Sequence, residues 1–287
     1  MKLSVLFLFC YHSPMSSDLV HIEFYSPDTE GGIKSKEHLA DLIVEEMKKR
    51  KSIEYAGHLN EKSLHDGILQ YLGNAGIGQY KQLPVAQKEK IQKQIEETLS
   101  KCNKVLPVPT KNYVFVFPYL PTQEDEVFRG VMGVARYSCV LHIFLSPDQW
   151  SSQALADTVA HELNHTIFYY HHYDDFNNYS LLDEMLVEGL AENFREQVID
   201  ETPAPWAVAL DKEKAFESLH SMNKKTLESK DRDLIKGVLF GDDVHERWTG
   251  YSIGYWLVKE LIRKKPDLPW SEIMKLRSHE IVEIAET

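Results

Sequence analysis

The segment ALADTVAHELNHTIFYY, residues 154–170, decides the fold around it because it joins a helical pattern to two histidines four residues apart. Its apolar residues recur at helical spacing, at Leu155, Val159, Leu163, Ile167 and Tyr170. Positions four apart lie on one face of a helix, so His161 and His165 present two imidazoles to one point. Glu162 lies about 100° round the helix, where its carboxylate can reach a water on a metal without being a ligand. The segment therefore predicts a metal-binding helix with a neighbouring general base.

A third ligand is needed, because a catalytic zinc site uses three protein ligands and keeps a fourth position open. One candidate is His171, at the place where the extended pattern HExxHxxGxxH has its third histidine. That pattern requires glycine where this chain has Phe168, and a continuing helix would turn His171 about 280° away from His161. We therefore favour the other candidate, Glu188, which follows 23 residues after His165.

Glu188 belongs to a second expected helix, whose start is marked by Ser180 and Asp183 in the spacing of a capping box. Residues 172–179 are rich in Asp and Asn, which favour a reversal of the chain. The second helix can then pack against the first and turn Glu188 toward the histidines. Gly189 is small and would let the two helix backbones approach closely.

Glu192 lies one turn beyond Glu188 on the same helix face. Its carboxylate can accept the second ring N–H of a ligand histidine, which would fix the tautomer of that ring. The alternative is that this acidic helix face points to solvent.

Three motifs together resemble a known family. HELNH at residues 161–165, EGLAENF at 188–194 and GYSIGY at 250–255 are similar to the YjaZ-type zinc-dependent proteases of the gluzincin class. The resemblance extends from about residue 113 to residue 261 and implies a zinc ion held by two histidines and a downstream glutamate. Residue by residue, it gives the ligand roles to His161, His165 and Glu188, and the role of general base to Glu162. It also implies the hydrolysis of peptide bonds.

The gluzincin class usually supplies a Tyr or His that stabilises the oxyanion formed during hydrolysis. Tyr251 and Tyr255 are candidates, four residues apart on a helix expected from Thr249 to Arg263. Gly250 and Gly254 form a ridge of small residues on the same helix, which would permit close packing. The alternative is that both tyrosines are buried aromatic residues that serve only the core.

The composition is that of a globular protein with a sizeable core: 43% of the 287 residues are hydrophobic and 26% are charged. The net charge of −12 argues against nucleic-acid backbones and anionic membranes as the main partners, since both are negatively charged. No segment approaches the roughly 20 apolar residues of a membrane-spanning helix. We expect the partner to be a peptide or protein substrate.

The three cysteines, Cys10, Cys102 and Cys139, are an odd number without CxxC spacing. They indicate neither a disulfide framework nor a cysteine metal site, and they favour a reducing compartment, the cytoplasm. The apolar run at residues 3–9 can be a buried strand, which we favour, or the core of a signal peptide. If residues 1–10 belong to a signal peptide, the protein is secreted.

The expected fold is α+β and mostly helical, with a zincin-like arrangement of a small antiparallel sheet beside the HExxH helix. Strands are expected at residues 113–117 and within residues 130–145. The segment LPVP at residues 106–109 is the clearest linker. We therefore expect a mostly helical N-terminal region, residues 1–109, and a metallopeptidase domain, residues 110–287, that ends in a helical lobe.

The sequence thus predicts a zinc metallopeptidase with one zinc ion per chain, in which Glu162 removes a proton from the attacking water. The alternative is a zinc-binding regulatory or binding module without peptidase activity. Glu162 favours the enzyme, because structural zinc sites are normally closed by four ligands, whereas three N/O ligands beside a free carboxylate suggest a reactive site.

Overall fold

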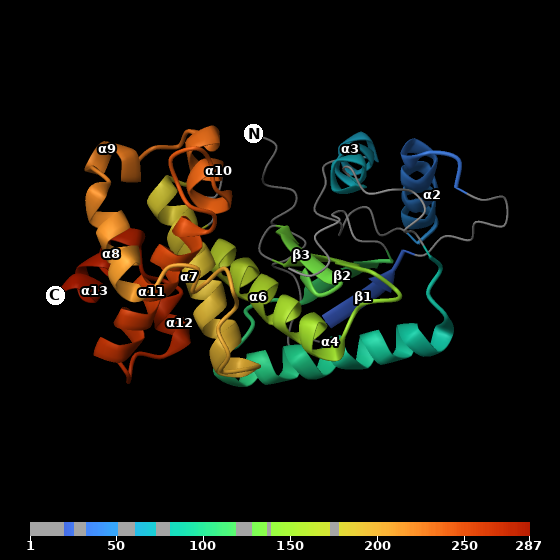
Figure 1. Ribbon diagram of the computed structural model, residues 1–287. Coiled ribbons are helices and arrows are strands. Elements are labelled where there is room, and N and C mark those ends of the chain that lie inside the picture. Colours follow the sequence, from blue (N-terminus) through green and yellow to red (C-terminus); the bar gives the residue numbers. More distant parts are fainter. Residues whose placement is uncertain are drawn as a thin grey trace, which may run out of the picture. The chain divides into compact units, whose positions relative to one another are not determined.

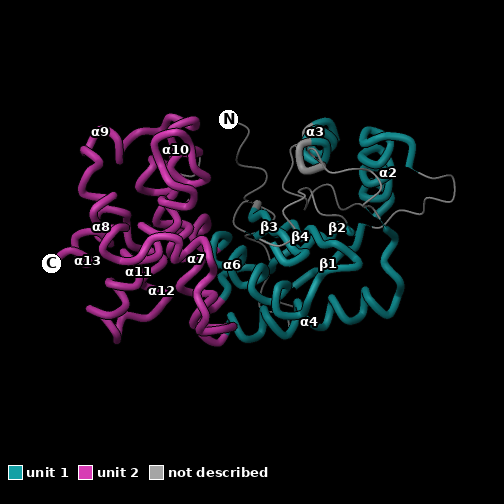
Figure 2. Tube along the Cα trace, in the orientation of Figure 1, with its two compact units in different colours: residues 1–103, 108–166 teal, residues 104–107, 167–287 magenta. Residues whose placement is uncertain are grey.

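The computed structural model (Figure 1) describes residues 20–25, 33–50, 61–72, 81–118, 128–136, 139–172 and 178–287. The chain forms two compact units, shown in different colours in Figure 2. Unit 1 comprises residues 1–103 and 108–166, and unit 2 comprises residues 104–107 and 167–287. The domain boundary expected at residue 109 stays a prediction.

Unit 1 contains a four-stranded sheet in the order β1-β2-β4-β3. Its strands are β1 (Val20–Phe24), β2 (Asn112–Phe117), β3 (Val131–Arg136) and β4 (Val140–Leu145). The β1–β2 and β2–β4 pairs are parallel, and only the β3–β4 hairpin is antiparallel. The predicted antiparallel sheet is therefore wrong: the sheet is mixed, and β1 brings a strand from the region expected to be helical.

The sequence of β4 gives a physical reason for the mixed sheet. All six of its residues, VLHIFL, are buried, and a run that is apolar except for His142 suits an inner strand that is covered on both faces and has a parallel neighbour. The hairpin with β3 then places β3 at the outer edge of the sheet.

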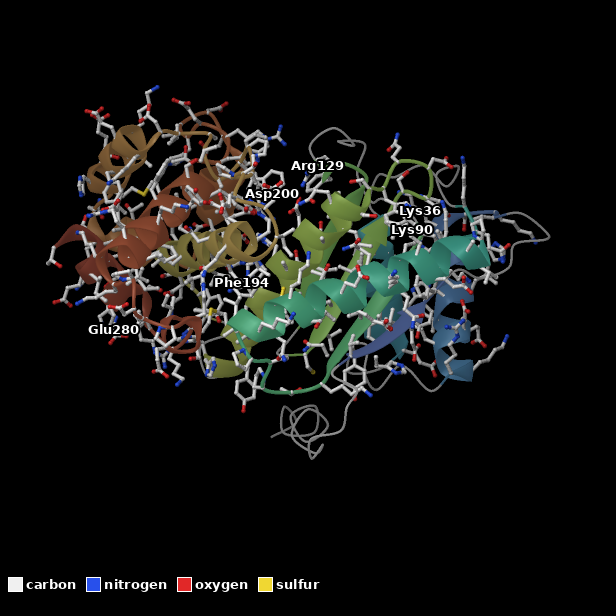
Figure 3. The ribbon with its side chains drawn as sticks, turned by 90° about the horizontal axis from the view of Figure 1, so that it is seen from below. Lys36, Lys90, Arg129, Phe194, Asp200 and Glu280 are labelled. Atoms are coloured by element: carbon white, nitrogen blue, oxygen red, sulfur yellow. The ribbon has the colours of Figure 1, made fainter. Side chains whose placement is uncertain are left out.

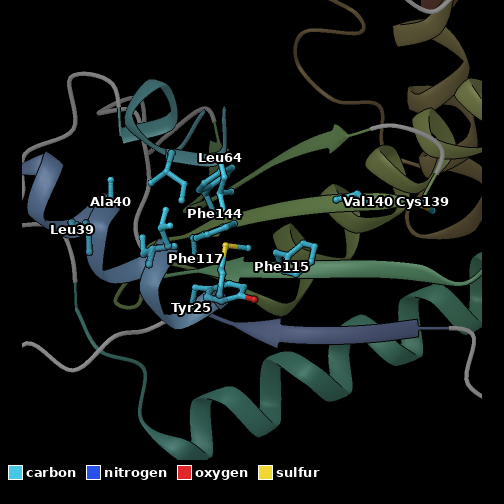
Figure 4. Close-up of a cluster of buried hydrophobic side chains, with 13 residues drawn as sticks. Tyr25, Leu39, Ala40, Leu64, Phe115, Phe117, Cys139, Val140 and Phe144 are labelled. Carbon is cyan, nitrogen blue, oxygen red and sulfur yellow. The ribbon is translucent and has the colours of Figure 1, made fainter. Parts of the chain in front are cut away.

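One face of the sheet is covered by α2 (Lys36–Lys49) and α3 (Glu61–Leu72), and Figure 1 shows α4 (Val85–Val105) on the other side. The core beneath α2 and α3 is aromatic (Figure 4): Phe117 stacks on Phe144 with ring centroids 5.0 Å apart, and Tyr25 stacks on Phe117. Met132 and Val134 of β3 also pack against this core. Because side chains alternate along a strand, the residues between them face the opposite side of the sheet, where α6 lies.

α6 (Ser152–His171) is the helix predicted for residues 154–170, and its existence is confirmed. It begins in unit 1, and its last five residues, 167–171, belong to unit 2. The Ser151 hydroxyl accepts a hydrogen bond from the Ala154 N–H (3.1 Å), which satisfies one of the free amides at the helix start.

The rest of unit 2 is helical. Its helices are α7 (Leu181–Val198), α8 (Lys212–Ser221), α9 (Lys224–Leu227), α10 (Arg232–Phe240), α11 (Thr249–Lys264), α12 (Trp270–Ile273) and α13 (Ser278–Glu286). The predicted helix at residues 249–263 is thus confirmed as α11. Among the described residues, no helix is both long and apolar enough to cross a membrane.

Glycines allow α11 to pack closely on α7. A Cβ at Gly254 would lie 2.6 Å from the Met185 carbonyl carbon and closer still to its oxygen, and one at Gly189 would lie 2.8 Å from the Gly254 Cα. The ridge of small residues predicted on α11 is therefore confirmed. Gly189, however, faces α11, and so its small size serves this contact and not the approach of the HExxH helix that we expected.

The cysteines differ from the sequence-based expectation. Cys139, directly before β4, is disulfide-bonded, whereas Cys102 is a free thiol whose pKa burial raises to about 12. Disulfides persist in oxidising environments, so the cysteines do not support the argument for a reducing compartment. Residues 1–19, which include the predicted N-terminal strand or signal peptide, lie outside the described residues.

Candidate metal site

α6 presents its two histidines as the four-residue spacing predicts. The Nε2 atoms of His161 and His165 lie 3.0 Å apart, and the two rings are perpendicular with their centroids 4.6 Å apart. His165 is buried and His161 is half-buried. The pair therefore offers two imidazole nitrogens to one point.

The third member of the group is Glu188. His161, His165 and Glu188 each offer one ligand atom, and these atoms all lie within 4.8 Å of one another. Glu188 is on α7, which starts with the predicted capping box: the Ser180 hydroxyl accepts from the Asp183 N–H, and the Asp183 carboxylate accepts from the Ser180 N–H. That box is confirmed, and it sets the first turn of the helix that carries Glu188.

The competing candidate, His171, is the last residue of α6. The helix therefore continues through Phe168, as expected if His171 is turned away from His161. Phe168 stacks on His172 with ring centroids 4.1 Å apart, and the His172 ring binds the carbonyl oxygen of Met274. Burial lowers the pKa of His171. Among the described residues, the group that could hold a metal consists of His161, His165 and Glu188, without His171.

The donor set of this group fits zinc. Zinc binds imidazole nitrogen and carboxylate oxygen at about 2.0–2.2 Å, so two ligand atoms of a tetrahedral site lie about 3.4 Å apart. The 3.0 Å between the two Nε2 atoms is close to that value, and 4.8 Å bounds all three pairs. Two histidines and one glutamate are also a ligand set of catalytic, rather than structural, zinc sites.

Glu162 is buried against β3, with 8% of its surface exposed. Its Oε2 accepts a hydrogen bond of 2.6 Å from the backbone N–H of Ala135. The backbone of Gly133, on the same strand, packs against the Glu162 side chain, where a Cβ would lie 2.9 Å from its Cδ. Sequence reasoning missed both β3 contacts, although a glycine inside a strand is a signal of close approach.

An ion pair with a buried carboxylate lies one helical turn before His161. Asp157 is 6% exposed, and its carboxylate binds the guanidinium of Arg129 and accepts from Gln153 Nε2 at 3.1 Å. Arg129, labelled in Figure 3, has a positive φ of 50° at the turn before β3. The pair compensates a buried charge and ties the start of β3 to α6. It was also missed from the sequence, because a pair 28 residues apart has no local pattern.

Glu192 is fully enclosed, with 1% of its surface exposed. One carboxylate oxygen accepts from Trp206 Nε1 at 2.6 Å, and the other accepts from Arg195 Nε at 3.2 Å. Arg195 is itself buried and donates to the carbonyl oxygen of Thr202 at 2.9 Å. The reading of Glu192 as part of a solvent-facing acidic surface is therefore wrong. The network fastens the segment after α7 to the helix that carries Glu188.

The two candidate tyrosines lie in different surroundings. Tyr255 is 2% exposed, and its hydroxyl donates to Glu196 Oε2 at 2.6 Å. Burial, together with Glu196, raises its pKa. Glu196 is eight residues beyond Glu188, about 12 Å along the helix axis, which places the Tyr255 hydroxyl in a packing role. Tyr251 is half-buried beside Phe240 and remains the better candidate for an oxyanion donor.

Comparisons with known proteins agree with these observations at the level of the family. A family model described as "Predicted Zn-dependent protease (DUF2268)" matches residues 91–283, which include α6 and α7. The chain is 24% identical over 217 residues to "Uncharacterized protein YjfC" of Bacillus subtilis (strain 168), and the alignment covers 69% of this chain and 71% of that protein. No solved structure matches the chain.

Proposed function

Because the chain belongs to the DUF2268 family of predicted zinc-dependent proteases, we propose that it is a zinc metallopeptidase that hydrolyses peptide bonds. The observation that carries this proposal is the group of His161, His165 and Glu188, with Glu162 next to His161 on α6. This combination is that of a zincin-like site of the gluzincin class. It agrees with the family resemblance seen in the three sequence motifs.

The two histidines and Glu188 would hold one zinc ion and leave a fourth position open for water or substrate. When bound, zinc polarises the scissile carbonyl and lowers the pKa of a coordinated water to about 7. The capping box of α7 and its glycine contacts with α11 support this assignment, because they make the helix of Glu188 rigid.

Glu162 is the proposed general base. Its carboxylate would take a proton from the attacking water and pass it to the nitrogen of the leaving amine. A carboxylate offers about four lone-pair positions, so the hydrogen bond from Ala135 to Oε2 leaves room for this proton transfer. No covalent bond between enzyme and substrate is required.

Two further residues have proposed supporting roles. Tyr251 would donate a hydrogen bond to the oxyanion of the tetrahedral intermediate. Glu192, one turn from Glu188 and buried, would support the ligand set indirectly, because its bonds with Trp206 and Arg195 hold the helix that carries Glu188.

The test is to measure zinc content and the cleavage of a mixed peptide library for the wild type, Glu162→Gln and Glu188→Ala. We expect one zinc per wild-type chain, loss of cleavage with zinc retained in Glu162→Gln, and loss of zinc in Glu188→Ala. Glu184→Ala is the matched control on α7, because Glu184 pairs with Arg232 at 2.8 Å, and it should keep both zinc and activity.

Two outcomes contradict the proposal. Zinc in the wild type without cleavage of any peptide would favour a zinc-binding regulatory or binding module. Absence of bound zinc after the wild type is exposed to the ion would exclude the site itself.

A further inference from the structure

β3 is the outer strand of the sheet, and its backbone amides fall into two sets. The Ser146 N–H donates to the Gly130 carbonyl at 2.9 Å. Because hydrogen-bonded and non-hydrogen-bonded pairs alternate along an antiparallel ladder, the even-numbered residues of β3 are the ones that bond to β4. The N–H of Ala135 consequently points away from β4. In place of another strand, Glu162 Oε2 accepts this N–H at 2.6 Å.

Gly133 gives the Glu162 side chain the space to reach that amide. A Cβ on Gly133 would lie 2.7 Å from Thr158 Cγ2 and 2.9 Å from Glu162 Cδ, and closer still to Glu162 Cγ. Carbon atoms in ordinary contact are about 3.5–4.0 Å apart. Any other residue at position 133 would therefore push the Glu162 side chain out of its present position.

We propose that β3 positions the general base: Gly133 and Ala135 together fix where the Glu162 carboxylate lies. This inference rests on the proposed function, because it assigns to two residues a role in its proton transfer. Neither residue acts on the substrate; both act through Glu162. A carboxylate acceptor makes such a hydrogen bond stronger than a bond between neutral groups.

The proposal predicts a loss of turnover rather than of binding. A misplacement of about 1 Å in a reacting group can lower the rate by about 100-fold. We expect Gly133→Ala to lower kcat by about 10- to 100-fold, with KM and zinc content unchanged. If Gly133 acts through Glu162, the same substitution in a Glu162→Gln background should change the residual rate less than about twofold, because coupled residues are not additive.

The Ala135 amide can be removed without removing a bond of the sheet. Proline is tolerated on an edge strand where the N–H points outward, so Ala135→Pro should deprive Glu162 of its donor and leave the pairing with β4 intact. Ala135→Gly is the matched control, because it changes the side chain but keeps the N–H. We expect a lower kcat, with zinc retained, in Ala135→Pro only.

A third measurement does not depend on activity. Hydrogen exchange of the Ala135 amide should be slow in the wild type and at least about tenfold faster in Glu162→Ala, since bonded amides exchange only after local opening. Equal exchange in both proteins would overturn the proposal, as would unchanged kcat in both Gly133→Ala and Ala135→Pro. Loss of zinc together with activity would also overturn it, by showing a merely structural role. A wild type that cleaves no peptide would instead refute the proposed function, and the exchange result would still decide whether Ala135 holds Glu162.

Discussion

Replacing Gly254 by alanine should destabilise the protein, although alanine is the better helix former. In the interior of a helix, the change from glycine to alanine favours the helix by about 0.8–1.0 kcal/mol. The new Cβ, however, would lie 2.6 Å from the Met185 carbonyl carbon and 3.2 Å from the Gly189 nitrogen. Both are backbone atoms of α7 and cannot rotate away, and the Met185 oxygen is closer still, so α11 and α7 would have to separate by more than about 1 Å to restore ordinary contact distances.

Overpacking of this kind typically costs about 1–3 kcal/mol, and we place this case at or above the upper end because the obstacle is backbone. After the gain in helix propensity, we expect a net loss of about 2–3 kcal/mol. Gly250→Ala is the matched control one turn earlier on α11. Its Cβ would meet only side-chain atoms, Leu239 Cδ2 at 2.8 Å and Met185 Cγ at 3.3 Å, which can shift. We expect its net effect to stay within about 1 kcal/mol of zero.

Urea unfolding followed by circular dichroism measures both effects as shifts of the midpoint at constant slope. The reasoning would be refuted if Gly254→Ala unfolded at the same or a higher urea concentration than the wild type, or if Gly250→Ala were the more destabilised of the two. A zinc titration of Gly254→Ala adds a functional readout, because α7 also carries Glu188. Weaker zinc binding in that variant would show that the packing of α11 on α7 supports the third ligand.

Three further predictions concern charge, the tyrosines and the metal. Hydrogen bonds from Arg263, and secondarily from Lys212, hold the pKa of the Glu260 carboxyl at about 2, below the ordinary value of 4.5. The ion pairs of Glu260 therefore stabilise the fold fully above pH 4.5, and this stabilisation is lost as the pH falls toward 2. Because Lys212 and Arg263 are 49% and 63% exposed, we expect these ion pairs to contribute roughly 1–2 kcal/mol to the free energy of unfolding. Acid unfolding of Glu260→Gln should therefore depend less on pH than that of the wild type. A profile like that of the wild type would contradict this. Tyr255→Phe should lower the free energy of unfolding by about 1 kcal/mol, because Glu196 loses a hydrogen-bond donor, and should leave kcat unchanged. A large fall in kcat would instead show that the Tyr255 hydroxyl takes part in the reaction. Removing zinc with a chelator should lower the unfolding temperature, and added zinc should restore it at pH 7. No zinc-dependent shift at pH 7 would speak against the site.

The local parts of the structure could be predicted from the sequence, because their causes are local. The spacing of His161 and His165 and the capping box of Ser180 and Asp183 each depend on residues within one or two helical turns. The choice of Glu188 over His171 also followed from a local fact, the bulky Phe168 that lets the helix continue.

The strand pairing could not be predicted in the same way. β1 and β2 are separated by 87 residues between Phe24 and Asn112, and no periodicity connects segments so far apart. The sequence did contain one signal that we did not use, the apolar run of β4, which only His142 interrupts and which indicates a strand covered on both faces. The hydrogen bond from Ala135 to Glu162 is harder still to foresee, because a backbone amide has no signature in the sequence.

Glycines inside regular elements are the signal that links the remaining features. In a helix interior, a glycine is about 1 kcal/mol less favourable than alanine, so a glycine in α7 or α11 indicates that another interaction offsets this cost. For Gly189 and Gly254 that interaction is the contact between the two helix backbones, and for Gly133 in β3 it is the side chain of Glu162. All three make room for a close approach, two at the contact between α11 and the helix of the proposed third ligand and one beside the proposed base. If these residues were only tolerated, alanine at each position would be neutral or stabilising, and so Gly133→Ala, Gly189→Ala and Gly254→Ala together test whether close backbone approach holds the ligand and the base in place.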